Sequence, residues 1–338
     1  MSSKGSILVT GANGGLGSAI ASQIVSSPEL AAHHGIYTAR NAASASALDA
    51  SLREPRSGPT ASPHSFEKVS LDLSRPSSVR EVAADISSRV AAGQIPPIRA
   101  IILNAGVEEF ATQTWTEDGL DLTFATNYLG HWLLTLMLLG SMDRDRGRIL
   151  WVTSWSHNPR DKHNSLNGAY EEDSATKDDP TGWAAGYRRY GASKLCGVMM
   201  IHELQRRLDQ DPLLNNISVL SLDPGAMPTG IMRHNESWFV RFVMFQVILP
   251  LITVFWGWLW PNGAFRTLEK SARDILAAVI ACGPPPPSEH PKGVFLNGSE
   301  QGEYNTEALD PVKRDVVWRG SVRHAKLEKG ETLLEKWE

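Results

Sequence analysis

Short apolar runs alternate with longer amphipathic segments along most of the chain. Runs rich in β-branched and aliphatic residues recur at 6–10, 35–40, 66–72, 98–106, 147–154, 216–225 and 293–298. Between them, segments such as 77–93 and 190–208 repeat apolar residues at the three- and four-residue spacing of a helix. Nearly continuous apolar strands joined by helix-length connections are typical of a parallel sheet covered on both faces. The pattern predicts a doubly wound α/β fold, the Rossmann type.

The alternation extends far enough to place residues 1–310 in a single domain, with 311–338 as a C-terminal extension. Two polar stretches, 43–65 and 157–182, predict exposed loops. The end of the extension, "KLEKGETLLEKWE" at 326–338, predicts an amphipathic helix.

Composition excludes several classes of protein. With 33 basic and 37 acidic side chains the net charge is -4, which provides no electrostatic footprint for nucleic acid. The two cysteines, Cys196 and Cys282, suit neither a disulfide framework nor a metal site, and we expect both to be small core residues in a reducing compartment. The first strand begins by Ser6, which leaves no room for a secretory signal. We therefore expect a cytoplasmic protein without a metal.

A glycine-rich turn, "TGANGGLG" at 10–17, closes the first strand and opens a helix. Its spaced glycines are Gly11, Gly15 and Gly17. Backbone without Cβ can approach a diphosphate closely, and the N–H groups at a helix start can bind its oxygens. In a βαβ unit this turn predicts a dinucleotide site.

The end of the second strand, "TAR", carries Arg40 where an enzyme for the unphosphorylated cofactor usually has an acid. A cation suits the 2′-phosphate that an acid would repel. The sequence favours NADP(H) over NAD(H).

A tyrosine and a lysine lie one helical turn apart in "YGASK", Tyr190 to Lys194. Both side chains then project from one face of a helix, where a nearby ammonium favours the phenolate. Tyr187 and Tyr170 have no lysine at the same spacing. This pair predicts a proton-transferring phenol.

The chain resembles the short-chain dehydrogenase/reductase family, and most closely its branch of retinol-dehydrogenase-like and fungal enzymes. The resemblance rests on seven motifs in order: "TGANGGLG", "LDL" at 71–73, "LNAG" at 103–106, "TNYLGHW", "VTS", "YGASK" and "PGAMPT" at 224–229. The interval from Ser154 to Tyr190 is longer than the family norm.

The resemblance implies four catalytic residues. Tyr190 would exchange a proton with the carbonyl oxygen, and Ser154 would hold that oxygen. Lys194 would lower the pKa of Tyr190 and bind the nicotinamide ribose, and Asn127 would link Lys194 to water. Tyr190, Lys194 and the following residues are implied to bind the cofactor: Gly11, Asn13, Gly14, Gly15, Leu16, Gly17, Arg40, Asp72, Leu73, Asn104, Ala105, Gly106, Pro224, Gly225 and Thr229.

Three functions fit these motifs. The first is an NADP(H)-dependent oxidoreductase acting on a ketone or secondary alcohol, and by resemblance to fungal tailoring enzymes it would serve secondary metabolism. The second is an isomerase, epimerase or cyclase that uses the same residues without net redox chemistry. The third is a noncatalytic nucleotide sensor, which the intact Ser154, Tyr190 and Lys194 argue against.

The apolar stretch "WFVRFVMFQVILPLITVFWGWLW" at 238–260 has the length of a membrane span. However, the strand at 293–298 must join the same sheet as the first strand, which argues against a span. We expect the stretch to belong to a substrate lid at about 226–265 or to a homodimer contact. Peripheral membrane binding is the alternative. Such a lid, together with Trp155 and Trp183 near the catalytic loop, predicts a bulky apolar substrate.

Overall fold

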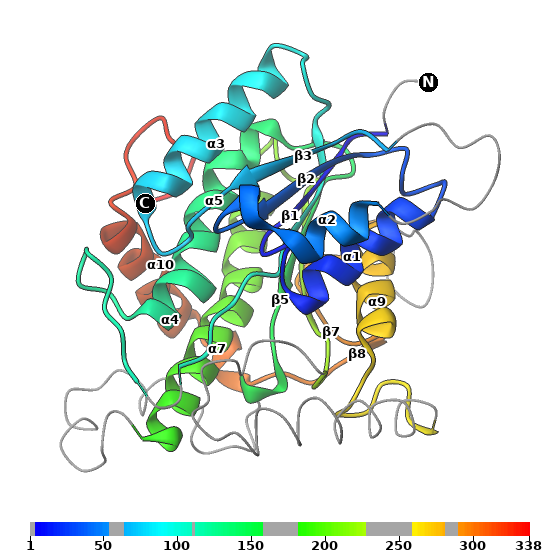
Figure 1. Cartoon of the computed structure of the whole chain (residues 1–338). Helices are drawn as coiled ribbons and strands as arrows, with labels where there is room; N and C mark the ends of the chain where they lie inside the picture. The colour runs from blue at the N-terminus through cyan, green and yellow to red at the C-terminus, as the bar shows by residue number, and fades with distance from the viewer. Residues whose placement is uncertain (1–3, 54–63, 110–111, 158–181, 228–258, 281–289) are drawn as a thin grey trace.

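The computed structural model describes residues 4–53, 64–109, 112–157, 182–227, 259–280 and 290–338. Their strands form one eight-stranded sheet in the order β3-β2-β1-β4-β5-β6-β7-β8 (Figure 1). The strands are β1 (Ser6–Val9), β2 (His34–Ala39), β3 (Phe66–Ser70), β4 (Ile98–Leu103), β5 (Arg148–Val152), β6 (Ser218–Asp223), β7 (Val294–Asn297) and β8 (Glu300–Gln301). The first seven are parallel, and β8 pairs antiparallel with β7.

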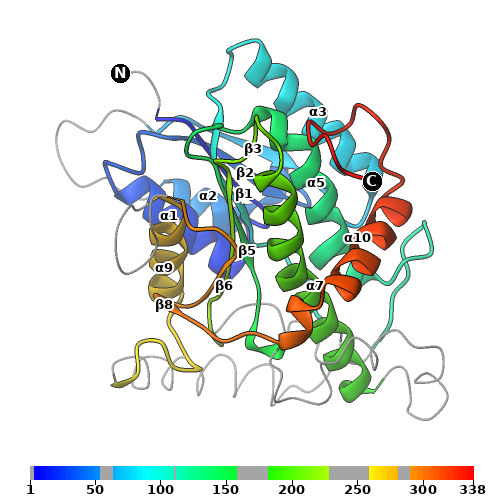
Figure 2. The same ribbon diagram turned by 180° about the vertical axis from the view of Figure 1, so that it is seen from behind.

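Helices cover both faces of this sheet (Figures 1 and 2). One layer contains α1 (Gly15–Ser26), α2 (Ser46–Leu52) and α9 (Leu268–Ile280), and the other contains α3 (Pro76–Ala91), α5 (Gly130–Leu138), α7 (Trp183–Asp209) and α10 (Pro311–Ala325). Shorter helical turns are η1 (Ala42–Ser44), α4 (Leu122–Phe124), η2 (Ala125–Leu129), η3 (Leu139–Ser141), η4 (Trp155–His157) and η9 (Thr306–Leu309).

Alternate residues of each central strand enter opposite cores. In β1, Ile7 and Val9 join the cluster under α1 and α9, whereas Leu8 joins the cluster under α3 and α5. All three side chains are fully buried. Burial on both faces is the reason that the strands are apolar without alternation, and the predicted doubly wound fold is confirmed.

Two local predictions were wrong. The stretch 43–65 was expected to be a loop, but η1 and α2 occupy its first part, because Leu48 is fully buried and Asn41 caps η1 by accepting a hydrogen bond from Ala43 N. The end of the chain was expected to be a helix, but α10 ends at Ala325 because Lys326 adopts a left-handed conformation with φ 50°. The remaining residues follow an irregular path.

Part of the lid prediction lies outside the described residues, as do most of 157–182 and Cys282. The two ends of the segment predicted to form the lid are described, and they are joined to each other. Ala226 and Phe265 form a parallel bridge, in which Ala226 N donates to Ala264 O at 2.7 Å and Arg266 N donates to Ala226 O at 2.9 Å. Within the described ranges, the segment Leu122–Ser141 has the length and composition of a membrane span, but 83% of its apolar 18-residue window is buried inside the protein.

Trp318 anchors α10 to the body of the fold. The side chain is fully buried, its ring lies edge-on to Trp132 with 5.3 Å between centroids, and its Nε1 donates to Trp337 O at 2.7 Å. Arg207 stacks over the same ring at 4.1 Å.

We expect Trp318→Ala to lower the free energy of unfolding by about 3–5 kcal/mol, because it leaves a large cavity and removes these contacts. Urea denaturation would measure the loss. Val316→Ala on the same helix is the matched control, since Val316 is 59% exposed and should change stability by less than about 0.5 kcal/mol. Equal stabilities of the two variants would contradict the anchoring role.

Candidate active site

A pocket of about 840 Å³ opens at the carboxyl ends of the parallel strands. Parallel α/β sheets bind ligands at this edge, where the strand order reverses on either side of β1 and β4. The pocket brings together most of the residues predicted from sequence: Gly11, Asn13, Gly14, Gly15, Leu16, Gly17, Arg40, Asp72, Leu73, Asn104, Ala105, Gly106, Ser154, Tyr190, Lys194, Pro224 and Gly225. Thr229 lies outside the described residues.

The glycine turn between β1 and α1 has no space for side chains. Gly11 has φ +64°, and a Cβ there would lie 2.8 Å from Ala105 Cα. A Cβ on Gly17 would lie 2.3 Å from Gly11 O. The first turn of α1 has no side-chain cap, so its N–H groups are available to an anion in the pocket. These features fit the diphosphate of a dinucleotide.

The Asn13 side chain bonds to the protein backbone at the start of α2. Its side-chain Oδ1 accepts hydrogen bonds from Ala47 N at 3.0 Å and Leu48 N at 3.1 Å, at the start of α2. The side chain therefore fixes α2 against the glycine turn.

Polar residues follow β2 and β3 at the far end of the pocket. Arg40 is exposed at the end of β2 and lines the pocket. Asp72 Oδ1 accepts from Ser74 N at 3.0 Å and from Ser74 Oγ at 2.6 Å, which fixes the turn that carries Leu73. This end has the cation and the apolar wall that suit a phosphorylated adenosine.

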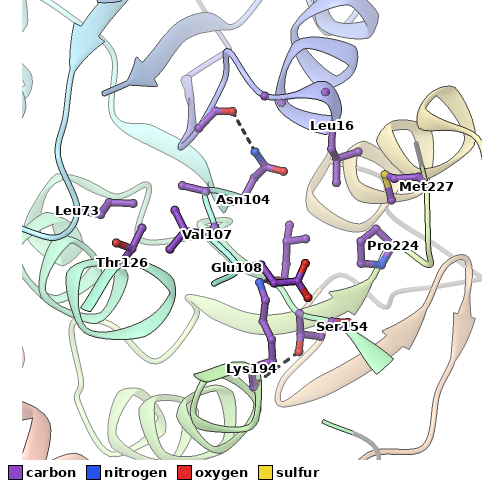
Figure 3. Close-up of a pocket in the computed structure, with 18 of the residues that line it drawn as sticks. Leu16, Leu73, Asn104, Val107, Glu108, Thr126, Ser154, Lys194, Pro224 and Met227 are labelled. Atoms are coloured by element: carbon purple, nitrogen blue, oxygen red, sulfur yellow. Dashed lines mark hydrogen bonds between the residues drawn. The ribbon is translucent and has the colours of Figure 1, made fainter. Parts of the chain in front are cut away.

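The ends of β1 and β4 are bonded to each other through Thr10 and Asn104, and Figure 3 shows the Asn104 side chain in the pocket. Asn104 Nδ2 donates to Thr10 O at 2.8 Å, and Thr10 Oγ1 accepts from Asn104 N at 2.9 Å and from Ala105 N at 3.0 Å. His131 Nε2 lies 2.9 Å from the same Thr10 oxygen. These bonds hold the glycine turn against the "LNAG" segment.

The three candidate catalytic side chains converge at the other end of the pocket. Tyr190 and Lys194 lie on one face of α7, with Lys194 Nζ 5.4 Å from the Tyr190 ring centroid. Lys194 Nζ donates to Val152 O at 3.1 Å. The hydroxyl groups of Ser154 and Tyr190 share a hydrogen bond, which acts to lower the pKa of Tyr190. The three side chains come together because Ser154 follows the end of β5, and α7, which carries Tyr190 and Lys194, packs beside that strand.

Burial decides the charges of these groups. It raises the pKa of Tyr190 well above 10, and it lowers the pKa of Lys194 to about 8. The phenol is therefore protonated at neutral pH, as a proton donor to a carbonyl must be. The expected lowering of the Tyr190 pKa by Lys194 stays a prediction.

Asn127 lies behind the pocket wall, within a π-helical turn, η2. Such turns are rare and are frequently found at functional sites. Asn127 Oδ1 accepts from Val107 N at 2.8 Å, and its Nδ2 donates to Val107 O at 3.0 Å and to Ser193 Oγ at 3.2 Å. Asn127 thus braces the segment after β4 against α7, and its predicted link between Lys194 and water stays a prediction.

Six further residues line the catalytic end of the pocket: Val107, Glu108, Trp155, Tyr187, Met227 and Phe265. Together with Ser154 and Tyr190, we call them the substrate half. The sequence predicted a substrate-lining role for Trp155 and missed that role for the other five. The available signal was that Val107 and Glu108 follow "LNAG", Trp155 follows "VTS" and Met227 follows "PGA".

The chain is similar in sequence and in fold to known proteins. The family model for short chain dehydrogenase matches residues 6–169. A short-chain dehydrogenase of Talaromyces variabilis, iccH, is 42% identical over the whole of both chains. Retinol dehydrogenase 14 of Mus musculus is 31% identical over 92% of this chain and 83% of its own length. The angucycline C-6 ketoreductase LanV, solved with bound NADP, has the same fold at 17% identity, with a TM-score of 0.55 over 88% of this chain and 96% of its own.

We expect Gly17→Ala to weaken dinucleotide binding about tenfold to a hundredfold, because overpacking of about 1–3 kcal/mol would displace the backbone at Gly11. Quenching of protein fluorescence by NADPH would measure the affinity. Gly320→Ala is the matched control, since a Cβ there meets nothing within 4 Å. Unchanged NADPH affinity in a folded Gly17→Ala variant would refute the role of the turn.

Proposed function

Since the chain belongs to the short-chain dehydrogenase family, and is thus an NAD(P)-dependent oxidoreductase, we propose that it transfers a hydride between NADP(H) and the carbon of a ketone or secondary alcohol. One observation carries the proposal: Ser154, Tyr190 and Lys194 meet at one end of a pocket whose other end is the glycine turn. A dinucleotide that spans the pocket would place its nicotinamide at the catalytic end.

The residues of the chain perform the proton chemistry. The nicotinamide supplies or accepts the hydride when bound. In reduction, the Tyr190 hydroxyl donates its proton to the developing alkoxide, and the Ser154 hydroxyl holds the same oxygen in position. Lys194, buried beside Tyr190, favours the phenolate that remains and is placed to bind the nicotinamide ribose. Oxidation of an alcohol reverses these steps.

Arg40 supports the choice of NADP(H). Its exposed guanidinium stands at the end of β2, at the adenosine end of the pocket, and can bind a phosphate with two parallel hydrogen bonds.

The substrate half supports a bulky apolar substrate. Its large side chains include Trp155, Tyr187, Met227 and Phe265. Among similar proteins, one is named a retinol dehydrogenase and another an angucycline ketoreductase. By this analogy we propose a tailoring reaction in secondary metabolism. A cytoplasmic location, a homodimer and a membrane contact through 238–260 stay predictions, and most of that segment lies outside the described residues.

We expect Arg40→Ala to weaken NADPH binding about tenfold to a hundredfold, because a hydrogen bond to a charged group contributes about 1.5–3 kcal/mol. NADH binding should not change, since NADH has no 2′-phosphate. Parallel titrations with both cofactors would measure this. Arg319→Ala removes an exposed arginine on α10 and is the control. Equal losses for NADPH and NADH would contradict the assignment of Arg40.

We expect Tyr190→Phe to lower kcat about 10²- to 10⁴-fold with 2-tetralone or 2-decalone as the ketone, because the variant has no proton donor. NADPH affinity should stay close to that of the wild type. Tyr304→Phe is the control, because Tyr304 packs on Phe295 and His202 away from the pocket. NADPH absorbance would report the rate.

The same assay separates hydride transfer from the isomerase alternative. Loss of ketone matched by loss of NADPH supports the oxidoreductase. Conversion of the ketone to an isomer without net loss of NADPH would support the alternative, and full activity of Tyr190→Phe would refute the proposed proton donor.

A further inference from the structure

Glu108 places a carboxyl group in the substrate half of the pocket. Figure 3 shows its side chain extending into the pocket near Ser154 and Lys194. The carboxyl group is close enough to Lys194 and Tyr190 to shift the pKa of each. A ligand whose carbonyl oxygen is held by Ser154 and Tyr190 therefore lies within the same cavity as Glu108.

The backbone on both sides of Glu108 is fixed. Val107 is held through both its N–H and its carbonyl by Asn127, at 2.8 and 3.0 Å. On the other side, Arg189 Nη2 donates to Glu109 O at 3.2 Å. Glu108 is thus held at a defined position, as a residue that recognises a ligand must be.

The carboxyl group of Glu108 has no hydrogen bond to the residues that the structure describes, and Lys194 is the only charged group that affects its pKa there. The neighbouring Glu109 is different, because its Oε1 accepts from Thr114 Oγ1 at 2.7 Å. Glu108 is half-buried. A polar group in that position destabilises the folded protein unless a ligand or water supplies a hydrogen-bond partner. Glu108 therefore has its hydrogen-bonding capacity available to the substrate.

Burial determines what Glu108 can bind. It raises the pKa of Glu108 to about 8, although Lys194 acts in the opposite direction. Below this pH the neutral carboxyl predominates, and it offers one O–H donor and one carbonyl acceptor. The adjacent Lys194 ammonium disfavours a cationic ligand. A hydroxyl group, which is neutral and both donates and accepts, is complementary to this arrangement.

We propose that Glu108 determines substrate specificity by binding a hydroxyl group on the ketone, so that the pocket selects a hydroxyketone with an apolar skeleton. The inference rests on the proposed ketone reduction and narrows its substrate class. A ketone with a methyl group in place of the hydroxyl would bury the Glu108 carboxyl without a partner, and a site of this kind discriminates strongly against such an analogue.

The test uses NADPH and pairs of simple ketones. The probes are cyclohexanones with a hydroxyl group on ring carbon 2, 3 or 4, each compared with the matching methylcyclohexanone. The wild type should prefer the hydroxyl member of at least one pair by about tenfold or more in kcat/KM. Glu108→Leu should abolish or reverse that preference.

Two further variants isolate the chemistry. Glu108→Gln keeps a neutral donor and acceptor of the same size, so its preference should stay within about threefold of the wild type. Glu109→Gln changes the same functional group one residue away, outside the pocket, and should leave the preference intact.

The outcomes distinguish this inference from the proposed function. Reduction of both members of every pair at equal efficiency, unaffected by Glu108→Leu, would overturn the role of Glu108 and leave ketone reduction standing. Loss of the preference in Glu108→Gln as well as Glu108→Leu would overturn recognition by the neutral carboxyl. Absence of NADPH oxidation with every probe would count against the proposed function and the inference together.

Discussion

The bonding between the ends of β1 and β4 is the constraint on which the pocket depends. The side-chain oxygen of Thr10 makes three polar contacts: it accepts hydrogen bonds from the backbone N–H groups of Asn104 and Ala105, and it lies 2.9 Å from Nε2 of His131. Thr10 precedes Gly11 in the chain, and Ala105 lies so close to Gly11 that a Cβ there would have no room. The bonds to Thr10 therefore fix the glycine turn against Ala105. A shift at Thr10 would therefore move the wall of the nucleotide site.

The same network continues to the catalytic end. His131 Nδ1 contacts Asn127 O at 3.2 Å, and Asn127 braces both Val107 and Ser193, whose hydroxyl donates to Tyr190 O at 2.7 Å. Burial lowers the pKa of His131 to about 3, so the ring stays neutral inside the core. A continuous set of hydrogen bonds between neutral groups thus aligns the two ends of the pocket. Lys194 supplies the positive charge at the catalytic end.

The sequence predicts the sheet well because each central strand is buried on both faces and is therefore rich in apolar residues without a two-residue alternation. The glycine turn and the Tyr190–Lys194 pair are predictable for a similar reason, since each depends on a local spacing. Glu108 and His131 are not, because their roles arise from contacts with segments far away in the chain. The irregular C-terminal end was also beyond prediction, because one left-handed residue, Lys326, outweighs the helical pattern after it.

The bridge between Ala226 and Phe265 has a consequence for how this enzyme evolves. It brings together the two ends of the intervening segment at the edge of the sheet. Insertions and replacements are tolerated best where the ends of a segment are already joined and the backbone bonds of the core are unaffected. Changes in the length or sequence of this segment should therefore leave the glycine turn and the Tyr190–Lys194 pair in place.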